Sequence, residues 1–167
     1  YLTVGKKKYK DVEEEVYGIM EKARQLQQAL LSMVDGDAEV FGEVAKVYGM
    51  PKDTPEEKAA REKAMEEALK HACSVPMDII RTAVEAIKLQ ARLGEIGSIM
   101  ALSDVGVGVL CLKAALISGK LNVIINLNGI KDESFVAKVS AEMEALVEEG
   151  IKIADETYKQ VEQRLTK

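Results

Sequence analysis

The stretch VGVGVLCLKAALI, from Val105 to Ile117, contains one charged side chain, Lys113, and is otherwise built from apolar residues and glycine. A helix that is apolar on every side belongs in the interior of a bundle. The stretch therefore predicts a buried central helix with amphipathic helices packed around it. Its two glycines allow close approach of another backbone, but they do not form a dinucleotide-binding motif, which requires a third glycine and a preceding strand.

Apolar residues recur at three- and four-residue steps on both sides of this stretch, which predicts amphipathic helices. The clearest helix start is Thr54-Pro55-Glu56-Glu57, a capping box with proline at the first helical position. Capping residues also predict starts at Asp11, with Glu14 closing its box, and at Asp132. The first helix should end near Met33.

Three features predict interruptions between helices. Asp35-Gly36-Asp37 should separate the first helix from a second that ends near Tyr48, and Val75-Pro76 should break or kink the chain. Ser103-Asp104 should cap the central helix, and Gly119 should end it. Beyond it, Leu121–Asn128 alternates like a strand, but nothing else could pair with it, so we expect a short helix or an irregular turn.

The segment that begins at Asp132 predicts a helix of about 32 residues, or about 48 Å. Such a rod is longer than a globule of this mass needs. We therefore predict an all-α, elongated helical bundle with a long C-terminal helix, made of a single domain over residues 1–167. The unmatched apolar stripe of that helix predicts a homodimer.

Composition narrows the function classes. The chain has 28 acidic and 23 basic residues and a net charge of −5, which argues against a nucleic-acid partner. No uninterrupted apolar run of 18 residues and no apolar leader are visible, so we expect neither a membrane span nor secretion. Cys73 and Cys111 lie in apolar helical contexts and are expected to be reduced core residues of a cytoplasmic protein.

The candidate chemistry lies in carboxylates and amides, because the single histidine, His71, excludes two-histidine metal motifs and no phosphate-binding loop is present. Asp35 and Asp37 are either helix caps or a coupled pair in which repulsion raises one pKa, giving an acid beside a base. Ser103-Asp104 is either a cap or a carboxylate at the rim of an apolar core that could hold a cationic ring.

Two amides and a run of lysines complete the candidates. Asn122 and Asn126 are four residues apart and share a face in a helix or a strand; they either tie helices together or hydrogen-bond a heterocycle. Lys6, Lys7 and Lys8 are either a solvated helix start or a site for an anionic ligand tail.

Several phrases in order resemble the cyclodeaminase/cyclohydrolase family, which includes the C-terminal half of formiminotransferase-cyclodeaminase and stand-alone bacterial relatives. The phrases are LTVGKKKY (2–9), MVDGDAEVF (33–41), YGMPKDTPEEKAAR (48–61), EEALKHACSVPMDI (66–79), ALSDVGVGVL (101–110) and LNVIINLNGIKDESFV (121–136). Each is weak alone, but the ordered set covers almost the whole chain. Family members usually carry a Gly-rich Pro-Gly-Gly-Gly-Ser segment before LTVGKKKY, which this sequence lacks.

The resemblance implies a homodimer with folate sites near the subunit interface and a tetrahydrofolate derivative as substrate, without a metal. It implies closure of 5-formiminotetrahydrofolate to 5,10-methenyltetrahydrofolate with release of ammonia, or hydrolysis of 5,10-methenyltetrahydrofolate to 10-formyltetrahydrofolate. Both reactions need a proton acceptor and a donor. We hypothesise Asp35 or Asp37 as acid/base and Asp104 as electrostatic partner. The hypothesised substrate contacts are Ser103, Asn122, Asn126, Lys6, Lys7 and Lys8.

The main competing hypothesis is a non-catalytic helical dimer that scaffolds other proteins. The lack of catalytic-histidine, nucleophile and metal-binding motifs favours this hypothesis. Within the enzyme hypothesis, a stand-alone chain leans toward cyclohydrolase. Folate binding would separate the two classes.

Overall fold

The computed structural model describes residues 2–166, and within them the chain forms an elongated bundle of α-helices without strands. The long helices are α1 (Glu13–Tyr48), α2 (Pro55–Ala72), α3 (Ser74–Ile96), α4 (Leu102–Leu127) and α5 (Glu133–Leu165). Two short 3-10 helices, η1 (Lys7–Val12) and η2 (Ile99–Ala101), precede α1 and α4. The predicted all-α fold and long C-terminal helix are confirmed.

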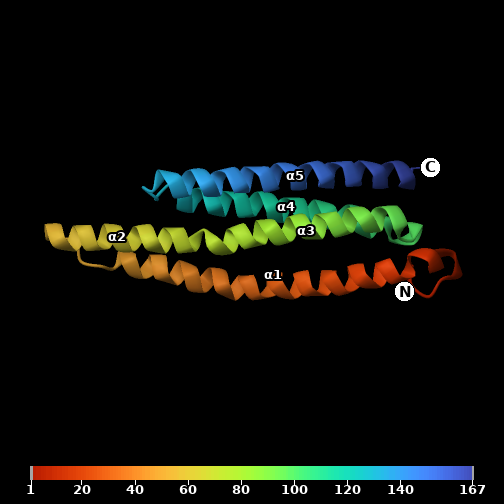
Figure 1. The fold of residues 1–167 in the computed structure, drawn as a ribbon, viewed down its shortest axis with the longest axis horizontal. Coiled ribbons are helices and arrows are strands. Elements are labelled where there is room, and N and C mark those ends of the chain that lie inside the picture. The colour runs from red at the N-terminus through yellow and green to blue at the C-terminus, as the bar shows by residue number, and fades with distance from the viewer. Residues whose placement is uncertain (1, 167) are drawn as a thin grey trace.

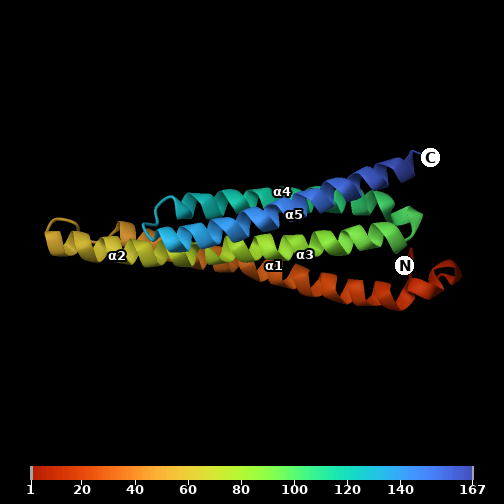
Figure 2. The ribbon, with the colours of Figure 1, turned by 45° about the horizontal axis from the view of Figure 1, so that its top comes forward.

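Helix α3 is the structural centre of the bundle. It packs against α1 on one side and against α4 and α5 on the other. Helices α2 and α3 follow one another almost end to end, and α1 runs along both (Figure 1). Both chain ends lie near the turn between α3 and α4, as Figures 1 and 2 show.

The core lies where α3, α4 and α5 meet. Ile80, Ile87 and Leu116 are fully buried there. Gly150 of α5 faces Leu116 so closely that an added Cβ would lie 2.6 Å from its Cδ2. Small residues at such crossings let the helix backbones approach, which gives the close packing expected of a protein interior.

Two of the predicted helix starts are confirmed. The Thr54 hydroxyl accepts from the N–H of Glu57 at 3.2 Å, and the Glu57 carboxylate accepts from the N–H of Thr54 at 3.0 Å. Asp132 caps α5 by accepting from the N–H of Phe135 at 3.0 Å. The predicted cap at Asp11 is wrong: Val12 precedes α1, and the chain enters it through η1.

The predicted breaks at glycine are wrong. Helix α1 runs for 36 residues straight through Asp35-Gly36-Asp37, so neither aspartate caps a helix. Helix α4 runs for 26 residues and passes through Gly119, which leaves the ambiguous segment before Asn128 as its last turns. Ser103 and Asp104 lie inside its first turn, and Ala101 occupies the capping position.

Helix α4 is also less buried than its sequence predicts. With η2 it forms a 29-residue segment, Ile99–Leu127, that is long and apolar enough to cross a membrane. Only 28% of the most apolar 18-residue window of this segment is buried inside the chain. Val107, Leu121 and Ile125 are more than 60% exposed, and Cys111 is exposed while Cys73 is buried. The central helix therefore has one covered face and one open apolar face, and the prediction that it is buried all round is wrong.

Candidate active site

A cavity of about 360 Å³ lies where α1, α2 and α4 come together. Its polar lining consists of Asp37 and Tyr48 from α1 and Asn122 and Asn126 from α4. The other lining side chains are mostly apolar, which is the usual composition of a small-molecule site with a few orienting polar groups. Three of the residues proposed from the sequence thus share one cavity.

Asp37 reaches the cavity because α1 is one continuous helix. Residues 37, 41, 44 and 48 follow the three- and four-residue steps that keep side chains on one face. Val44 is buried on that face, while the Asp37 side chain stays exposed at the rim. Asp35 is two residues earlier, about 200° around the helix, so it does not line the cavity and does not face Asp37. The two aspartates therefore point to different sides of α1 and do not share one site.

The two asparagines come from the last turns of α4. Asn126 is half-buried, and its side-chain nitrogen Nδ2 donates to the backbone carbonyl of Ala72 at 2.9 Å. Asn122, one turn earlier, lines the same cavity and is exposed. Asn126 therefore has the first of the two predicted roles, because its hydrogen bond ties α4 to α2. It also lines the cavity, where the second role, a hydrogen bond to a heterocycle, would be played.

The other proposed residues lie at the opposite end of the rod. Ser103 lines a separate groove between the start of α4 and the end of α5. Asp104 and Asn122 are 18 residues apart on one helix, or about 27 Å. Lys7 and Lys8 lie in η1 and Lys6 directly before it, all exposed, and the nearby Thr3 hydroxyl accepts from the N–H of Ser98 at 3.0 Å. None of these residues lines the cavity.

Tyr48 and Pro76 are among the cavity residues that sequence reasoning missed. Tyr48 places a phenol at the rim with 65% of its surface exposed. Its position eleven residues after Asp37 gives three helical turns, so the pattern was detectable once the helix was known to continue. Pro76 forms part of the apolar wall and is fully buried.

The loop between α4 and α5 closes the cavity at Gly129, and ion pairs hold this loop to α2. Lys70 contacts Asp132 at 2.8 Å, and this contact lowers the pKa of the Asp132 carboxyl. Glu66 accepts from the N–H groups of Lys131 and Asp132, at 2.9 and 3.0 Å, which holds its pKa below the ordinary value. The cavity edge is therefore fixed by charge-assisted hydrogen bonds.

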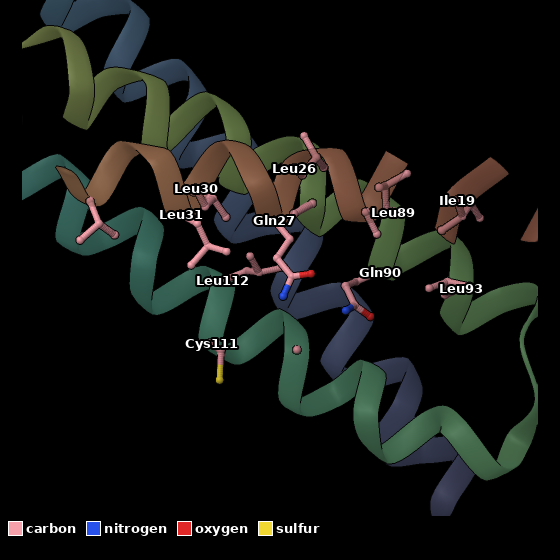
Figure 3. Close-up of a pocket in the computed structure, with 14 residues that line it drawn as sticks. Ile19, Leu26, Gln27, Leu30, Leu31, Leu89, Gln90, Leu93, Cys111 and Leu112 are labelled. Atoms are coloured by element: carbon pink, nitrogen blue, oxygen red, sulfur yellow. The ribbon is translucent and has the colours of Figure 1, made fainter. Parts of the chain in front are cut away.

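A larger groove of about 610 Å³ is lined by α1, α3 and α4. Helices α1 and α4 both pack on α3 but make few contacts with each other. Figure 3 shows leucines from all three helices along it, with the carboxamides of Gln27 and Gln90 among them. Cys111 is its one titratable lining residue. The groove thus lacks the carboxylate that acid/base chemistry needs, and the smaller cavity is the better candidate. Among residues 2–166, no cluster of three metal-ligating side chains is present.

The comparison with known sequences agrees with the phrases noted above. The sequence model described as formiminotransferase-cyclodeaminase matches residues 1–145, most of the chain. The chain belongs to this family. A methenyltetrahydrofolate cyclohydrolase of Methylorubrum extorquens is 39% identical over 98% of this chain and 79% of its own length.

Two further relatives have the cyclodeaminase name. Formimidoyltransferase-cyclodeaminase of Sus scrofa is 28% identical over 89% of this chain, which spans 28% of that longer protein. The crystal structure of formiminotetrahydrofolate cyclodeaminase from Thermotoga maritima superimposes with a TM-score of 0.77 at 32% identity, covering 98% of this chain and 76% of that one. The family thus contains proteins named for both reactions.

Proposed function

We propose that this chain is a one-carbon folate enzyme that hydrolyses 5,10-methenyltetrahydrofolate to 10-formyltetrahydrofolate in the cavity between α1, α2 and α4. The observation that carries the proposal is the presence of Asp37, Asn122 and Asn126 around one cavity. The 39% identity to a methenyltetrahydrofolate cyclohydrolase favours this reaction over the cyclodeaminase reaction. The second candidate, closure of formiminotetrahydrofolate with loss of ammonia, is supported by the likeness to the Thermotoga maritima protein.

Asp37 is the proposed acid/base group. Water attacks the cationic carbon between the two folate nitrogens, and the carboxylate accepts the proton that this water loses. The resulting tetrahedral adduct collapses as the bond from carbon to N5 breaks. The proton held by Asp37 is returned to that nitrogen, and the remaining hydroxyl proton leaves as the formyl carbonyl forms. The same carboxylate attracts the cationic ring before reaction.

The exposed face of α4 supports a homodimer. Its exposed large apolar residues are Val107, Leu110, Ile117, Leu121 and Ile125. With the small residues Cys111, Ala114 and Ser118 they form a stripe along the helix. From Val107 to Leu121 the stripe has the same spacing in both directions about Ala114, so two α4 helices can pair along it in antiparallel orientation. Such a pair brings the Asp104 end of one copy toward the Asn122 end of the other.

The test of the catalytic proposal compares Asp37→Asn with Asp35→Asn. Both variants remove one exposed carboxylate from the middle of α1, and only the first removes it from the cavity. We expect kcat for loss of the methenyl absorbance to fall by about 10² to 10⁴ in Asp37→Asn and to change less than about twofold in Asp35→Asn. Ammonia release from formiminotetrahydrofolate, measured in parallel, distinguishes the two reactions.

Equal activity of both variants would remove Asp37 from the mechanism. If the purified wild-type chain binds and converts neither folate, the scaffold hypothesis replaces the enzyme. The dimer is tested separately by light scattering: Leu121→Glu should yield monomers, whereas Gln160→Glu, on an exposed part of α5, should leave the mass unchanged.

A further inference from the structure

The junction between α2 and α3 leaves one backbone carbonyl without its helical donor. Cys73 joins the two helices with φ −75° and ψ −20°, so the chain stays nearly helical across the junction. In a continuous helix, the carbonyl of Ala72 would accept from the N–H of residue 76. Residue 76 is proline, which has no N–H. Ala72 is buried, so its carbonyl has little access to water and needs another donor.

Asn126 supplies that donor from α4. Its Nδ2 lies 2.9 Å from the Ala72 oxygen. A carbonyl can only accept, so the amide must present its nitrogen to Ala72 and its oxygen elsewhere. Within residues 2–166 no protein donor is bonded to Oδ1 of Asn126, and the residue lines the cavity. The amide oxygen is therefore left to accept from a ligand bound in the cavity.

We propose that Asn126 is a specificity-determining residue whose Oδ1 accepts from a ring N–H of the substrate, and that Pro76 fixes this orientation by leaving the Ala72 carbonyl to Asn126. The inference rests on the proposed function. A tetrahydropterin ring carries such donors at N3, at N8 and on its amino group. Asp37, which is acceptor-only when ionised, adds to the same preference. The cavity thus selects a donor-rich, cationic heterocycle and disfavours rings that present lone pairs there.

The test separates binding by Asn126 from its structural hydrogen bond. Asn126→Ala removes both. Pro76→Ala restores an N–H at residue 76, so Ala72 regains a helical donor whether or not Asn126 is present. The full chain is prepared as wild type, as each single variant and as the double variant. KM and kcat for 5,10-methenyltetrahydrofolate and the thermal midpoint are measured for each.

We expect Asn126→Ala to lower the thermal midpoint and to raise KM by about tenfold or more, the loss expected for one buried hydrogen bond. In the double variant the midpoint should return to that of Pro76→Ala, while KM stays about tenfold above the KM of Pro76→Ala. The rate constant kcat should change much less than KM, because Asn126 contacts the ring and not the reacting carbon.

Recovery of KM together with stability in the double variant would overturn the proposal, because it would reduce Asn126 to a structural contact. A thermal midpoint that stays low in the double variant would refute the role of Pro76. If the wild-type chain converts no folate, the proposed function fails instead, and the stability measurements still decide whether Pro76 and Asn126 are coupled.

Discussion

Replacing Gly150 by alanine tests how tightly α3, α4 and α5 are packed. An added Cβ would lie 2.6 Å from Cδ2 of Leu116, 3.2 Å from Cγ2 of Val84 and 3.6 Å from Cδ1 of Ile87. Leu116 and Ile87 are 0% exposed and Val84 is 2% exposed, so no side chain can swing into water. Overpacking of this kind costs about 1–3 kcal/mol. Alanine gains about 1 kcal/mol over glycine in a helix, so we expect a net loss of about 0–2 kcal/mol.

A matched control and a second-site change define the expected signs. Gly18→Ala in α1 adds a Cβ with nothing within 4 Å and should stabilise by about 1 kcal/mol. Leu116→Ala alone should destabilise by about 2–5 kcal/mol. It also removes the atom that Gly150→Ala would meet. In that background Gly150→Ala should stabilise, giving a coupling of about 1–3 kcal/mol between the two sites.

The assay is urea unfolding followed by circular dichroism, with free energies from linear extrapolation. The decisive quantity is the difference between the effects of Gly150→Ala in the wild-type and Leu116→Ala backgrounds, expected to be about 1–3 kcal/mol. If Gly150→Ala stabilised the wild type as much as Gly18→Ala does, the three helices would not be in the close contact described here, and the account of the core would be wrong.

Three further predictions concern helix capping, pH and thiol chemistry. Thr54→Ala should lower the free energy of unfolding by about 1 kcal/mol, whereas Ser32→Ala, exposed in the middle of α1, should change it by less than about 0.5 kcal/mol in urea titrations. The pKa of Asp132 is lower in the folded chain than its ordinary value of 3.8, mainly because of its hydrogen bond with Lys70. The ionised carboxylate therefore stabilises the fold above pH 3.8, and this stabilisation is lost as the pH falls through the lowered folded pKa. Lys70→Met should reduce the loss of stability measured by unfolding between about pH 5 and pH 2. Burial raises the pKa of Cys73 to about 11, so a chain whose other cysteine is replaced by serine should not react with Ellman's reagent at pH 8 until it is unfolded.

Local chemistry predicted part of the fold. The boxes and caps at Thr54 and Asp132 were read correctly because a cap is satisfied within four residues of the chain. The error at Gly119 has the opposite cause. An added Cβ at Gly119 would lie 2.9 Å from Cγ1 of Ile80, so this glycine marks a contact between α4 and α3 and not the end of a helix. Such a contact joins residues far apart in the chain, and one sequence does not show it.

Sequence alone could predict only which site residues share a face when they are close together in the chain. Asn122 and Asn126 share a face by spacing alone, and Asp37 joins them because α1 and α4 both border α2. Asp104 was grouped with them by chemistry, and the uninterrupted length of α4 keeps it at the other end of the rod.

Helix α4 has the sequence of a helix buried on all sides, although one of its faces is exposed in this chain. Leu116 and Val123 are fully buried on the covered face, while Val107 and Leu121 are more than 60% exposed on the other. A helix that uses two faces in two different interfaces is apolar all round, whether both interfaces belong to one chain or not. The apolar pattern of α4 thus predicts burial on both faces, and a single chain buries only one of them. The proposed antiparallel pair of α4 helices supplies the second side, and it would bring Asp104 of one copy toward the cavity of the other.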